Sequence, residues 1–553
     1  MNFQFSHPYT INPHYQKRVA YFCMEYGIHQ SFKIYAGGLG FLAGSHMRSA
    51  YELRQNLVGI GILWKYGYYD QVRKSDQTMD VLFEEKRYGF LQATDIKFTI
   101  KINNHDVWVT ACYLPPELFH TAPLFFLSTD LPENDYLAKT ICHRLYDANA
   151  EAKIAAAILL GEGGAHLFDY LNWQPEVYHL NESHALPLAF HLYSKTKNTD
   201  ALKQQLVFTN HTPEEAGNQK TLITLLNKMN FFCEVPVTEV KAITQMEGEV
   251  MDHTLAALRL SGTGNSVSQK HLQTLFAMWQ PYAGICNMIS ITNAQNFNFW
   301  ADKEMYAALE QKNDDALLKR KLACKQLLFE EVADQDGEIF KEKILTIVFA
   351  KRFTGYKRPE LLLNNMERFH KIVTNKEHPV QIIWAGKPYP QDYSGIGSFD
   401  RIVNICKEYS NCSILAGYEM KLSKLLKGGA DVWLNIPRLT HEASGTSGIA
   451  AAMNGAVNVA LPDGWFPEFA KDKINSFVVP PCDITKHDYE QDEADAGSLY
   501  NLLEKEIIPM YYEYPNRWLD IMKNGMKDIV PQFDSNRLAD EYYYKLYLNA
   551  QAK

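Results

Sequence analysis

Short, continuous runs of apolar residues, each followed by a polar or glycine-rich turn, recur along this chain and constrain its fold most strongly. In the first part of the chain these runs are residues 19–22, 177–180, 206–209 and 289–292. In the second part they are residues 344–349, 380–385, 412–415 and 432–434. Amphipathic stretches such as 359–370, which the pattern predicts to be helices, separate them. Because a strand buried on both faces has no polar side, such runs indicate parallel sheets covered by helices, and the sequence predicts an α/β fold.

Two such regions are expected, because 553 residues exceed what one hydrophobic core usually organises. A charged helical stretch at 303–331 and polar residues up to Gly337 separate the two series of strands. The predicted domains are therefore 1–337 and 338–553, both Rossmann-like, with helices from Ser498 onward as candidates to pack back on the first domain. Ligands in such folds bind at the carboxyl ends of strands, so we expect a site in an interdomain cleft.

Composition excludes several classes of protein. The net charge of −9, with no run of five like charges, gives no basic face for nucleic acid. No segment approaches the roughly 20 apolar residues that cross a bilayer, and the first 20 residues lack a signal-peptide core. Nine scattered cysteines without a CxxC spacing are typical of reduced thiols, so a cytoplasmic protein is expected.

Residues 37–44 form a glycine-rich segment that contains a formal G-x-G-x-x-A match. The acidic residue expected about 20 positions after a dinucleotide fingerprint is absent, so this match does not support a dinucleotide site. We expect a turn into a helix whose free N–H groups, at Gly37 and Gly38, meet an anion. A tight turn without a ligand is the alternative.

Four cations follow the strand predicted at 344–349, namely Lys351, Arg352, Lys357 and Arg358. A guanidinium and an ammonium on one turn can hold a phosphate from two directions. The alternative is a basic patch that only contacts solvent.

Polar side chains also follow the strands predicted at 177–180 and 206–209, and they are of the kind that binds sugar hydroxyls. His179, Glu182 and His184 are residue types that bind zinc, but their spacing matches no common zinc site. No metal site is predicted.

Residues 442–455 combine one carboxylate with small residues and a hydroxyl pair, which suits a backbone that approaches a sugar and a phosphate closely. An aldehyde cofactor held covalently needs an amine. No lysine occurs between Lys427 and Lys471, so this segment supplies none.

Together these motifs resemble the α-glucan (glycogen, starch and maltodextrin) phosphorylases of the short bacterial and archaeal type. The matching segments, in family order, are residues 21–44, 181–182, 210–213, 292–293, 352, 356–358, 385–387, 431–435 and 442–448. The resemblance covers most of the chain and implies a GT-B glycosyltransferase fold. It also implies reversible, configuration-retaining phosphorolysis of α-1,4-glucan to glucose 1-phosphate. The implied partners are α-glucan and inorganic phosphate, and a homodimer is possible.

The resemblance assigns expected roles to individual residues. Arg352 and Lys357 would clamp the substrate phosphate, helped by N–H groups around Gly37 and Gly38. His211 and Asn293 would hold the glucosyl unit near its 6-hydroxyl. The remaining substrate-binding positions are Asn181, Glu442, Ser444 and Gly445, of which the last three would meet the 3- and 4-hydroxyls.

The same resemblance implies a cofactor site. Lys351, Thr446 and Ser447 match positions that receive the phosphate of pyridoxal 5'-phosphate, and Tyr418 matches a residue that lines its ring. Ala450, however, occupies the position of the family's Schiff-base lysine. Pyridoxal phosphate is therefore expected to bind only noncovalently or to be absent.

Other positions also depart from the family pattern. Residues 293–296 read Asn-Ala-Gln-Asn instead of Asn-Gly-Val-His, residues 153–157 lack the usual Arg, Gln and Glu, and Ser45 replaces Asp. Two further functions remain open for this reason. One is a GT-B transferase that uses a nucleotide sugar, and the other is a catalytically silent glucan-binding or regulatory paralogue.

Overall fold

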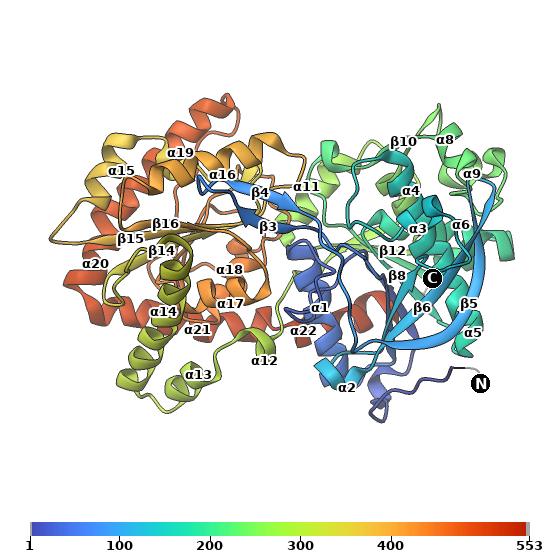
Figure 1. The fold of residues 1–553 in the computed structure, drawn as a ribbon, viewed down its shortest axis with the longest axis horizontal. Coiled ribbons are helices and arrows are strands. Elements are labelled where there is room, and N and C mark those ends of the chain that lie inside the picture. The colour runs from blue at the N-terminus through green and yellow to red at the C-terminus, as the bar shows by residue number, and fades with distance from the viewer. Residues whose placement is uncertain (1–2, 549–553) are drawn as a thin grey trace. The chain divides into compact units, whose positions relative to one another are not determined.

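The structure is a computed structural model that describes residues 3–548, and the chain forms two α/β units (Figure 1). Unit 1 contains residues 1–68, 83–293 and 535–553, and unit 2 contains residues 69–82 and 294–534. Among the described residues, no helix combines the length and the apolar character needed to span a membrane. The nine cysteines are all free thiols.

Unit 1 is built on a nine-stranded sheet with the order β13-β12-β9-β8-β1-β2-β7-β6-β5. The strands from β13 to β7 are parallel, and β6 and β5 continue the sheet in antiparallel pairing. Their bounds are β1 Val19–Phe22, β2 Leu57–Ile62, β5 Gln92–Ile102, β6 His105–Leu114, β7 Leu124–Ser128, β8 Val177–Asn181, β9 Leu206–Thr209, β12 Thr263–Ser266 and β13 Asn287–Ser290.

Helices and a small hairpin complete unit 1. The helices are α1 Gly38–Glu52, α2 Pro116–Phe119, α3 Tyr136–Thr140, α4 Ala150–Ile158, α5 Gly164–Leu171, α6 Pro187–Thr196, α7 Thr199–Lys203, α8 Ile223–Lys228, α9 Val237–Thr244, α10 His253–Leu260, α11 Gln269–Trp279 and α22 Ser535–Glu541. The hairpin pairs β10 Lys220–Leu222 with β11 Val250–Asp252. A π-helical turn, Leu159–Gly163, joins α4 to α5.

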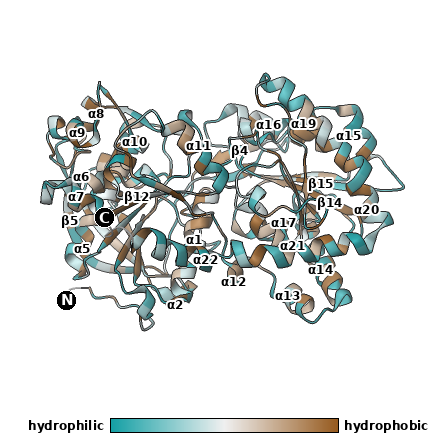
Figure 2. Cartoon of the chain, turned by 180° about the vertical axis from the view of Figure 1, so that it is seen from behind, coloured by the Kyte–Doolittle hydropathy of each residue, from teal (hydrophilic) through white to brown (hydrophobic). Residues whose placement is uncertain are grey.

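Unit 2 contains a six-stranded parallel sheet with the order β16-β15-β14-β17-β18-β19. Counted along the unit this order is 3-2-1-4-5-6, the doubly wound Rossmann arrangement. The bounds are β14 Leu345–Ala350, β15 Val380–Ala385, β16 Cys412–Leu415, β17 Val432–Asn435, β18 Val457–Ala460 and β19 Phe477–Val478. The strands β14 and β15 are strongly hydrophobic, as Figure 2 shows, because helices cover both faces of the sheet.

The helices of unit 2 are α12 Phe297–Trp300, α13 Lys303–Glu310, α14 Asp314–Asp336, α15 Met366–Val373, α16 Tyr393–Cys406, α17 Met420–Gly429, α18 Ser447–Ala452, α19 Asp488–Leu502, α20 Ile508–Glu513 and α21 Pro515–Phe533. An antiparallel hairpin of β3 Asp70–Arg73 and β4 Met79–Leu82 also belongs to this unit. Gln71 Nε2 of the hairpin donates to Gly386 O at 3.1 Å.

The observed boundary between the two units, after Asn293, differs from the domain boundary predicted at Gly337. Residues 294–337 belong to unit 2, because Leu328 and Val332 of α14 pack in one hydrophobic cluster with Val348 and Ile383 of its sheet. Residues 535–548 belong to unit 1, where α22 packs on α1. The long helix predicted over 359–370 is instead a 3₁₀ turn, Leu361–Leu363, followed by α15.

Candidate functional site

Several of the predicted site residues follow strands at the points where the strand order of each sheet reverses. In unit 2, β14 and β17 are neighbours, and they are followed by Lys351 and by the segment that leads to Glu442. In unit 1, β1 and β8 are neighbours, and they are followed by the glycine-rich turn and by Glu182. Loops at such points line the crevices where open α/β sheets bind ligands.

The glycine-rich turn of unit 1 is organised by a carboxylate that sequence reasoning did not single out. The N–H groups of Ala36 and Gly37 donate to Glu25 Oε2 at 2.6 and 3.1 Å. Tyr146 Oη donates to Glu25 Oε1 at 2.8 Å. A Cβ on Gly40 would lie 2.7 Å from Glu25 Oε2, so this position requires glycine. The Gly37 N–H is therefore engaged within the protein, which differs from its predicted anion-binding role, and the role of Gly38 stays a prediction.

His211 of unit 1 is held as a neutral imidazole. Its Nε2 lies 2.7 Å from Asn181 Oδ1, an oxygen that only accepts, so Nε2 carries the proton. Burial lowers the pKa of His211 to about 3. Asn181 Nδ2 donates to Cys23 Sγ at 3.2 Å, so both ends of this amide are used inside the protein. Asn181 thus positions His211, and the direct substrate contact predicted for Asn181 stays a prediction.

Glu182, which directly follows β8, anchors the same loop. Its Oε1 accepts a hydrogen bond from His211 N at 2.5 Å and another from Thr212 Oγ1 at 3.2 Å. Its Oε2 accepts from Ser183 N at 3.3 Å. Burial raises the pKa of this carboxyl above its ordinary value. The Glu182 side chain therefore fixes the backbone that carries His211.

Asn293 retains an unused acceptor. Its side chain is 4% exposed, and among the described residues no group donates to its Oδ1. Its backbone N–H donates to Val267 O at 3.0 Å, which fixes the residue after β13. Because buried polar atoms are nearly always satisfied, an orphan acceptor of this kind indicates a place for a donor such as a sugar hydroxyl.

In unit 2 the predicted phosphate ligand Lys357 forms an ion pair with the predicted sugar ligand Glu442. Both residues are buried, at 8% and 6% exposure. Burial alone lowers the pKa of the Lys357 ammonium, but Glu442 more than offsets it, and the net pKa is raised. Lys357 is therefore a charged lysine whose position is set by Glu442.

The Glu442 backbone is fixed by a second carboxylate, Asp463. Asp463 Oδ2 accepts from Glu442 N at 3.1 Å, and Oδ1 accepts from Gly464 N at 2.9 Å. Burial raises the pKa of Asp463 to about 6. Gly445 has φ +86°, and a Cβ there would lie 3.1 Å from Glu442 Cδ. A glycine at 445 lets the chain turn closely around the Glu442 side chain.

Lys351 and Ser447 form a second polar pair in unit 2. Lys351 Nζ donates to Ser447 Oγ at 2.5 Å. Burial, and secondarily the charge of Lys357, lowers the pKa of Lys351 to about 7. Thr446, beside Ser447, is also buried. The predicted cofactor-phosphate residues thus lie together on the loop after β14 and at the start of α18.

Two further predicted cofactor positions lie on the same unit. Ala450, in α18, is fully buried. Tyr418 Oη lies 3.3 Å from Ser423 Oγ of α17, and the Tyr418 ring packs against the hydrophobic cluster beneath the sheet.

Further buried polar atoms in unit 2 have no partner among the described residues. They include Ser444 Oγ, which was predicted to bind sugar, and both side-chain amide atoms of Asn435. Asn435 ends β17 and was part of the segment 431–435 that carried the family resemblance, but nothing in its spacing indicated a buried, unsatisfied amide. Such atoms favour a ligand that offers hydroxyl or phosphate groups.

The four cations after β14 divide into distinct roles. Arg352 is exposed, whereas the Arg358 guanidinium is buried against Asp495 at 2.8 Å and Asp492 at 3.1 Å. Arg358 is therefore a structural cation. The expectation of a merely solvated basic patch does not hold for this residue or for Lys351 and Lys357, which are also buried.

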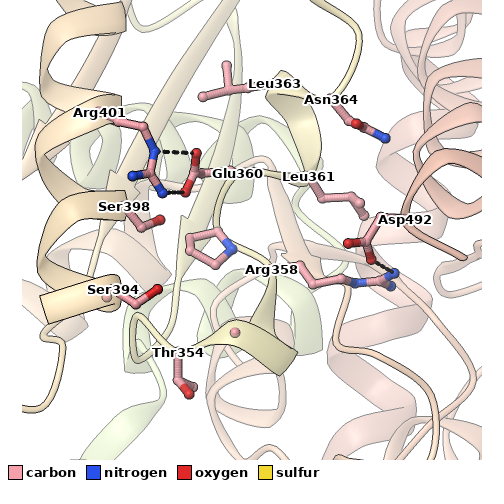
Figure 3. A pocket seen from close by; sticks show the side chains of 13 residues that line it. Thr354, Arg358, Glu360, Leu361, Leu363, Asn364, Ser394, Ser398, Arg401 and Asp492 are labelled. Atoms are coloured by element: carbon pink, nitrogen blue, oxygen red, sulfur yellow. Dashed lines mark hydrogen bonds and ion pairs between the residues drawn. The ribbon is translucent and has the colours of Figure 1, made fainter. Parts of the chain in front are cut away.

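A pocket of about 400 Å³ adjoins this turn in unit 2. Figure 3 shows the Glu360–Arg401 and Arg358–Asp492 ion pairs on its wall. The complete lining is Thr354, Gly355, Arg358, Pro359, Glu360, Leu361, Leu363, Asn364, Ser394, Gly395, Ser398, Arg401 and Asp492. Because neither Arg352 nor Lys357 lines it, this pocket is distinct from the predicted phosphate position.

Lys351→Met is expected to stabilise the protein most below about pH 7 and progressively less toward the ordinary lysine pKa of 10.5. Between these values the unfolded chain binds a proton at Lys351 that the folded chain does not, so the cost of burying Lys351 falls as pH rises. Urea midpoints of both proteins from pH 6.5 to 10 measure this difference. A difference that is independent of pH contradicts a lowered pKa.

Comparisons with known proteins give consistent results. A family model described as carbohydrate phosphorylase matches residues 285–476. An uncharacterised protein of Methanocaldococcus jannaschii is 44% identical over 533 residues, 96% of this chain and 100% of that protein. Maltodextrin phosphorylase of Thermococcus litoralis is 33% identical over 98% of this chain and 72% of its own length. Glycogen phosphorylase of Aquifex aeolicus is 29% identical over 96% of this chain and 86% of its own length.

Proposed function

This chain belongs to the carbohydrate phosphorylase family and has its GT-B fold, and from that premise we propose that it is an α-glucan phosphorylase. It transfers a glucosyl unit reversibly from an α-1,4-glucan to inorganic phosphate and gives glucose 1-phosphate with retained configuration. The observation that carries the proposal is the pair of buried lysines after β14, Lys351 with Ser447 and Lys357 with Glu442. Lysine side chains buried at one edge of a sheet favour a phosphate ligand, and the Ser447 hydroxyl beside Lys351 adds a further donor.

Residues of unit 2 bind phosphate in this proposal. Arg352 and Lys357 hold the substrate phosphate, the first as an exposed guanidinium and the second as a buried ammonium. Lys357 stays charged because of Glu442, so its charge does not depend on the ligand. The Glu442 carboxylate accepts hydrogen bonds from the 3- and 4-hydroxyls of the sugar. The Ser444 hydroxyl and the Gly445 backbone also bind these hydroxyls. The orphaned Ser444 Oγ supports this assignment.

Residues of unit 1 hold the glucosyl unit near its 6-hydroxyl. His211 is neutral with its proton on Nε2, so Nδ1 is an acceptor for a hydroxyl proton. Asn293 Oδ1 offers a second acceptor. Asn181 and Glu182 act through His211, because their polar atoms are committed within the loop.

Retention of configuration sets the electrostatic demand on the site. The reacting sugar passes through a cationic, oxocarbenium-like state, which negative charge beside it stabilises. Arg352 and Lys357 favour the dianionic form of phosphate, which is the better nucleophile and the better counter-ion. Arg352 and Lys357 therefore act on the protonation and position of the phosphate.

The residues present fit the phosphate of pyridoxal 5'-phosphate but not its covalent attachment. Lys351 Nζ, Ser447 Oγ and the buried Thr446 form a donor set of the right chemistry for a phosphate. Ala450 offers no amine. When bound through Lys351, Thr446 and Ser447, the cofactor would supply a second phosphate group to the site. We propose that this chain holds it noncovalently.

The proposed function predicts glucose 1-phosphate from maltodextrin and phosphate when pyridoxal phosphate is added. The Lys351→Met variant is expected to need a higher cofactor concentration for the same rate, because it loses one donor to the cofactor phosphate. Absence of product at saturating glucan, phosphate and cofactor contradicts the proposal. Product from a nucleotide sugar favours the nucleotide-sugar transferase instead. Sedimentation with glycogen without turnover of either donor favours the silent paralogue.

Noncovalent binding predicts no borohydride-stable adduct between this chain and pyridoxal phosphate. Reduction followed by intact mass measurement should give the unmodified mass for the native chain and a one-cofactor increase for Ala450→Lys. The buried Lys427 of α17 is the amine to check, since α17 contacts α18 and burial lowers the pKa of Lys427 well below its usual value. An adduct on the native chain that Lys427→Met removes contradicts noncovalent binding.

A further inference from the structure

A cluster of potential metal ligands lies inside unit 1, apart from every residue used above. Glu162 comes from the π-helical turn Leu159–Gly163, His191 from α6, and Cys233 from the loop after α8. One ligand atom from each lies within 4.8 Å of the other two, and all three residues are buried. Three separate elements thus bring a carboxylate, an imidazole and a thiol to one point.

The three ligand atoms of this cluster lie close enough to reach one ion. Cys233 Sγ lies 3.6 Å from Glu162 Oε2. Ligands at the usual zinc distances of about 2.0–2.3 Å and tetrahedral angles are separated by roughly 3.5 Å. The present spacing therefore suits a single ion.

An unsatisfied imidazole nitrogen points to a missing ligand. His191 is 5% exposed, and its Nε2 is buried without a hydrogen-bond partner among the described residues. Buried ring nitrogens are normally bonded to a polar group or to a metal. Cys233 Sγ has a competing contact with Pro187 O at 3.4 Å, but a carbonyl engages only the thiol proton and leaves the sulfur lone pairs available.

The next helical turn carries a fourth potential metal ligand, His166. His166 of α5 lies one turn after Glu162, and its Nε2 is 3.9 Å from Glu162 Oε1. The rings of His166 and His191 make an edge contact with centroids 4.7 Å apart. His166 is partly exposed, so it offers both a ligand and a route for an ion.

The backbone around the cluster supports a specific arrangement. Cys233 and Glu234 have φ values of +50° and +64°, which non-glycine residues rarely adopt. Glu162 lies in a π-helical turn, and such turns are frequent at functional sites. The local structure therefore holds these side chains in place at some conformational cost.

We propose that Glu162, His191 and Cys233, with His166 as the fourth ligand, form a structural site for a divalent transition metal of the zinc class. A thiolate with imidazole and carboxylate ligands is typical of zinc and disfavours calcium and magnesium, which prefer oxygen. The carboxylate and thiolate balance the charge of the ion, and the thiol proton leaves to solvent on binding. The site ties together the α4–α5 helical segment, α6 and the loop after α8.

The test is direct metal binding by the full-length chain after removal of metals with a chelator. After Zn²⁺ is added and the excess is removed by desalting, we expect one equivalent of zinc by elemental analysis. When Co²⁺ is added instead, we expect a sulfur-to-cobalt charge-transfer absorption. Bound zinc should also raise the melting temperature, because it binds the folded chain. Zinc content near zero, with no such absorption, overturns the proposal.

Variants assign the binding to these residues. Cys233→Ser and His191→Gln should each weaken zinc binding by at least about 100-fold, since even partners outside the ligand set cost 10–100-fold. The matched control Cys286→Ser alters another buried thiol of unit 1 and should retain one equivalent. Retention of the ion and of the cobalt absorption by both ligand variants overturns the assignment. Cobalt binding to the native chain tests the site even where a variant fails to fold.

The site was not predictable from the sequence, which led us to expect no metal. Glu162 and His166 are four residues apart, but His191 and Cys233 follow 25 and 42 residues later, so the four ligands do not form one local motif. Only the packing of α6 and the loop after α8 against the π-helical turn brings them together.

Discussion

Lys357→Met is expected to lower the free energy of unfolding by about 3–5 kcal/mol and to remove phosphorolysis. The substitution leaves the buried Glu442 carboxylate without its ion-pair partner, and an uncompensated buried charge is costly. Urea unfolding followed by tryptophan fluorescence measures the first effect. Release of glucose 1-phosphate measures the second.

The double variant Lys357→Met with Glu442→Gln separates these effects. Because it removes the unpaired carboxylate, it should recover most of the lost stability while remaining inactive. A single variant as stable as the parent would show that the pair is not buried as described. An active double variant would remove Lys357 from the proposed phosphate site.

Arg358→Met should also cost about 3–5 kcal/mol of stability, because it strands the carboxylate of Asp495, whose side chain is 1% exposed. The guanidinium also donates to the carbonyls of Ile436 and Pro437 at 2.9 and 3.0 Å, and these bonds are lost as well. Chemical denaturation measures the loss.

Arg352→Met is the matched control for this prediction. Arg352 is exposed, so its loss should change stability by less than about 0.5 kcal/mol. It should instead raise the phosphate concentration needed for half-maximal rate. If the Arg352 variant is the less stable of the two, the division of these neighbouring arginines between binding and structure is wrong.

Much of the fold followed from local pattern. The strands predicted at 19–22, 206–209, 380–385 and 412–415 have the observed bounds, because each is a continuous apolar run in a sheet buried on both faces. The antiparallel strands β5 and β6 were not predicted. Their buried and exposed residues alternate, so neither strand forms a continuous apolar run. The unit boundary was not predicted because it depends on which sheet α14 packs against. The sequence of a helix does not identify its packing partner.

The candidate site was predictable to a similar degree. Lys351, Lys357 and Glu442 were found because they belong to segments with a recognisable residue order. The contacts that decide their chemistry were not predictable. The Lys357–Glu442 pair joins positions 85 residues apart. The Glu25 side chain accepts a hydrogen bond from a turn 11 residues further along the chain. Such contacts depend on side-chain direction in three dimensions.

The hairpin β3–β4 has a consequence for how this protein is synthesised. It leaves the ribosome early, yet its partners in unit 2 come much later, since Gln71 bonds to Gly386, 315 residues further on. Unit 1 in turn receives α22, where Ser535 Oγ lies 2.6 Å from Ser49 Oγ, 486 residues away. Neither unit can finish folding on a nascent chain that stops at residue 293. Both units therefore gain their last contacts only after nearly the whole chain has been synthesised.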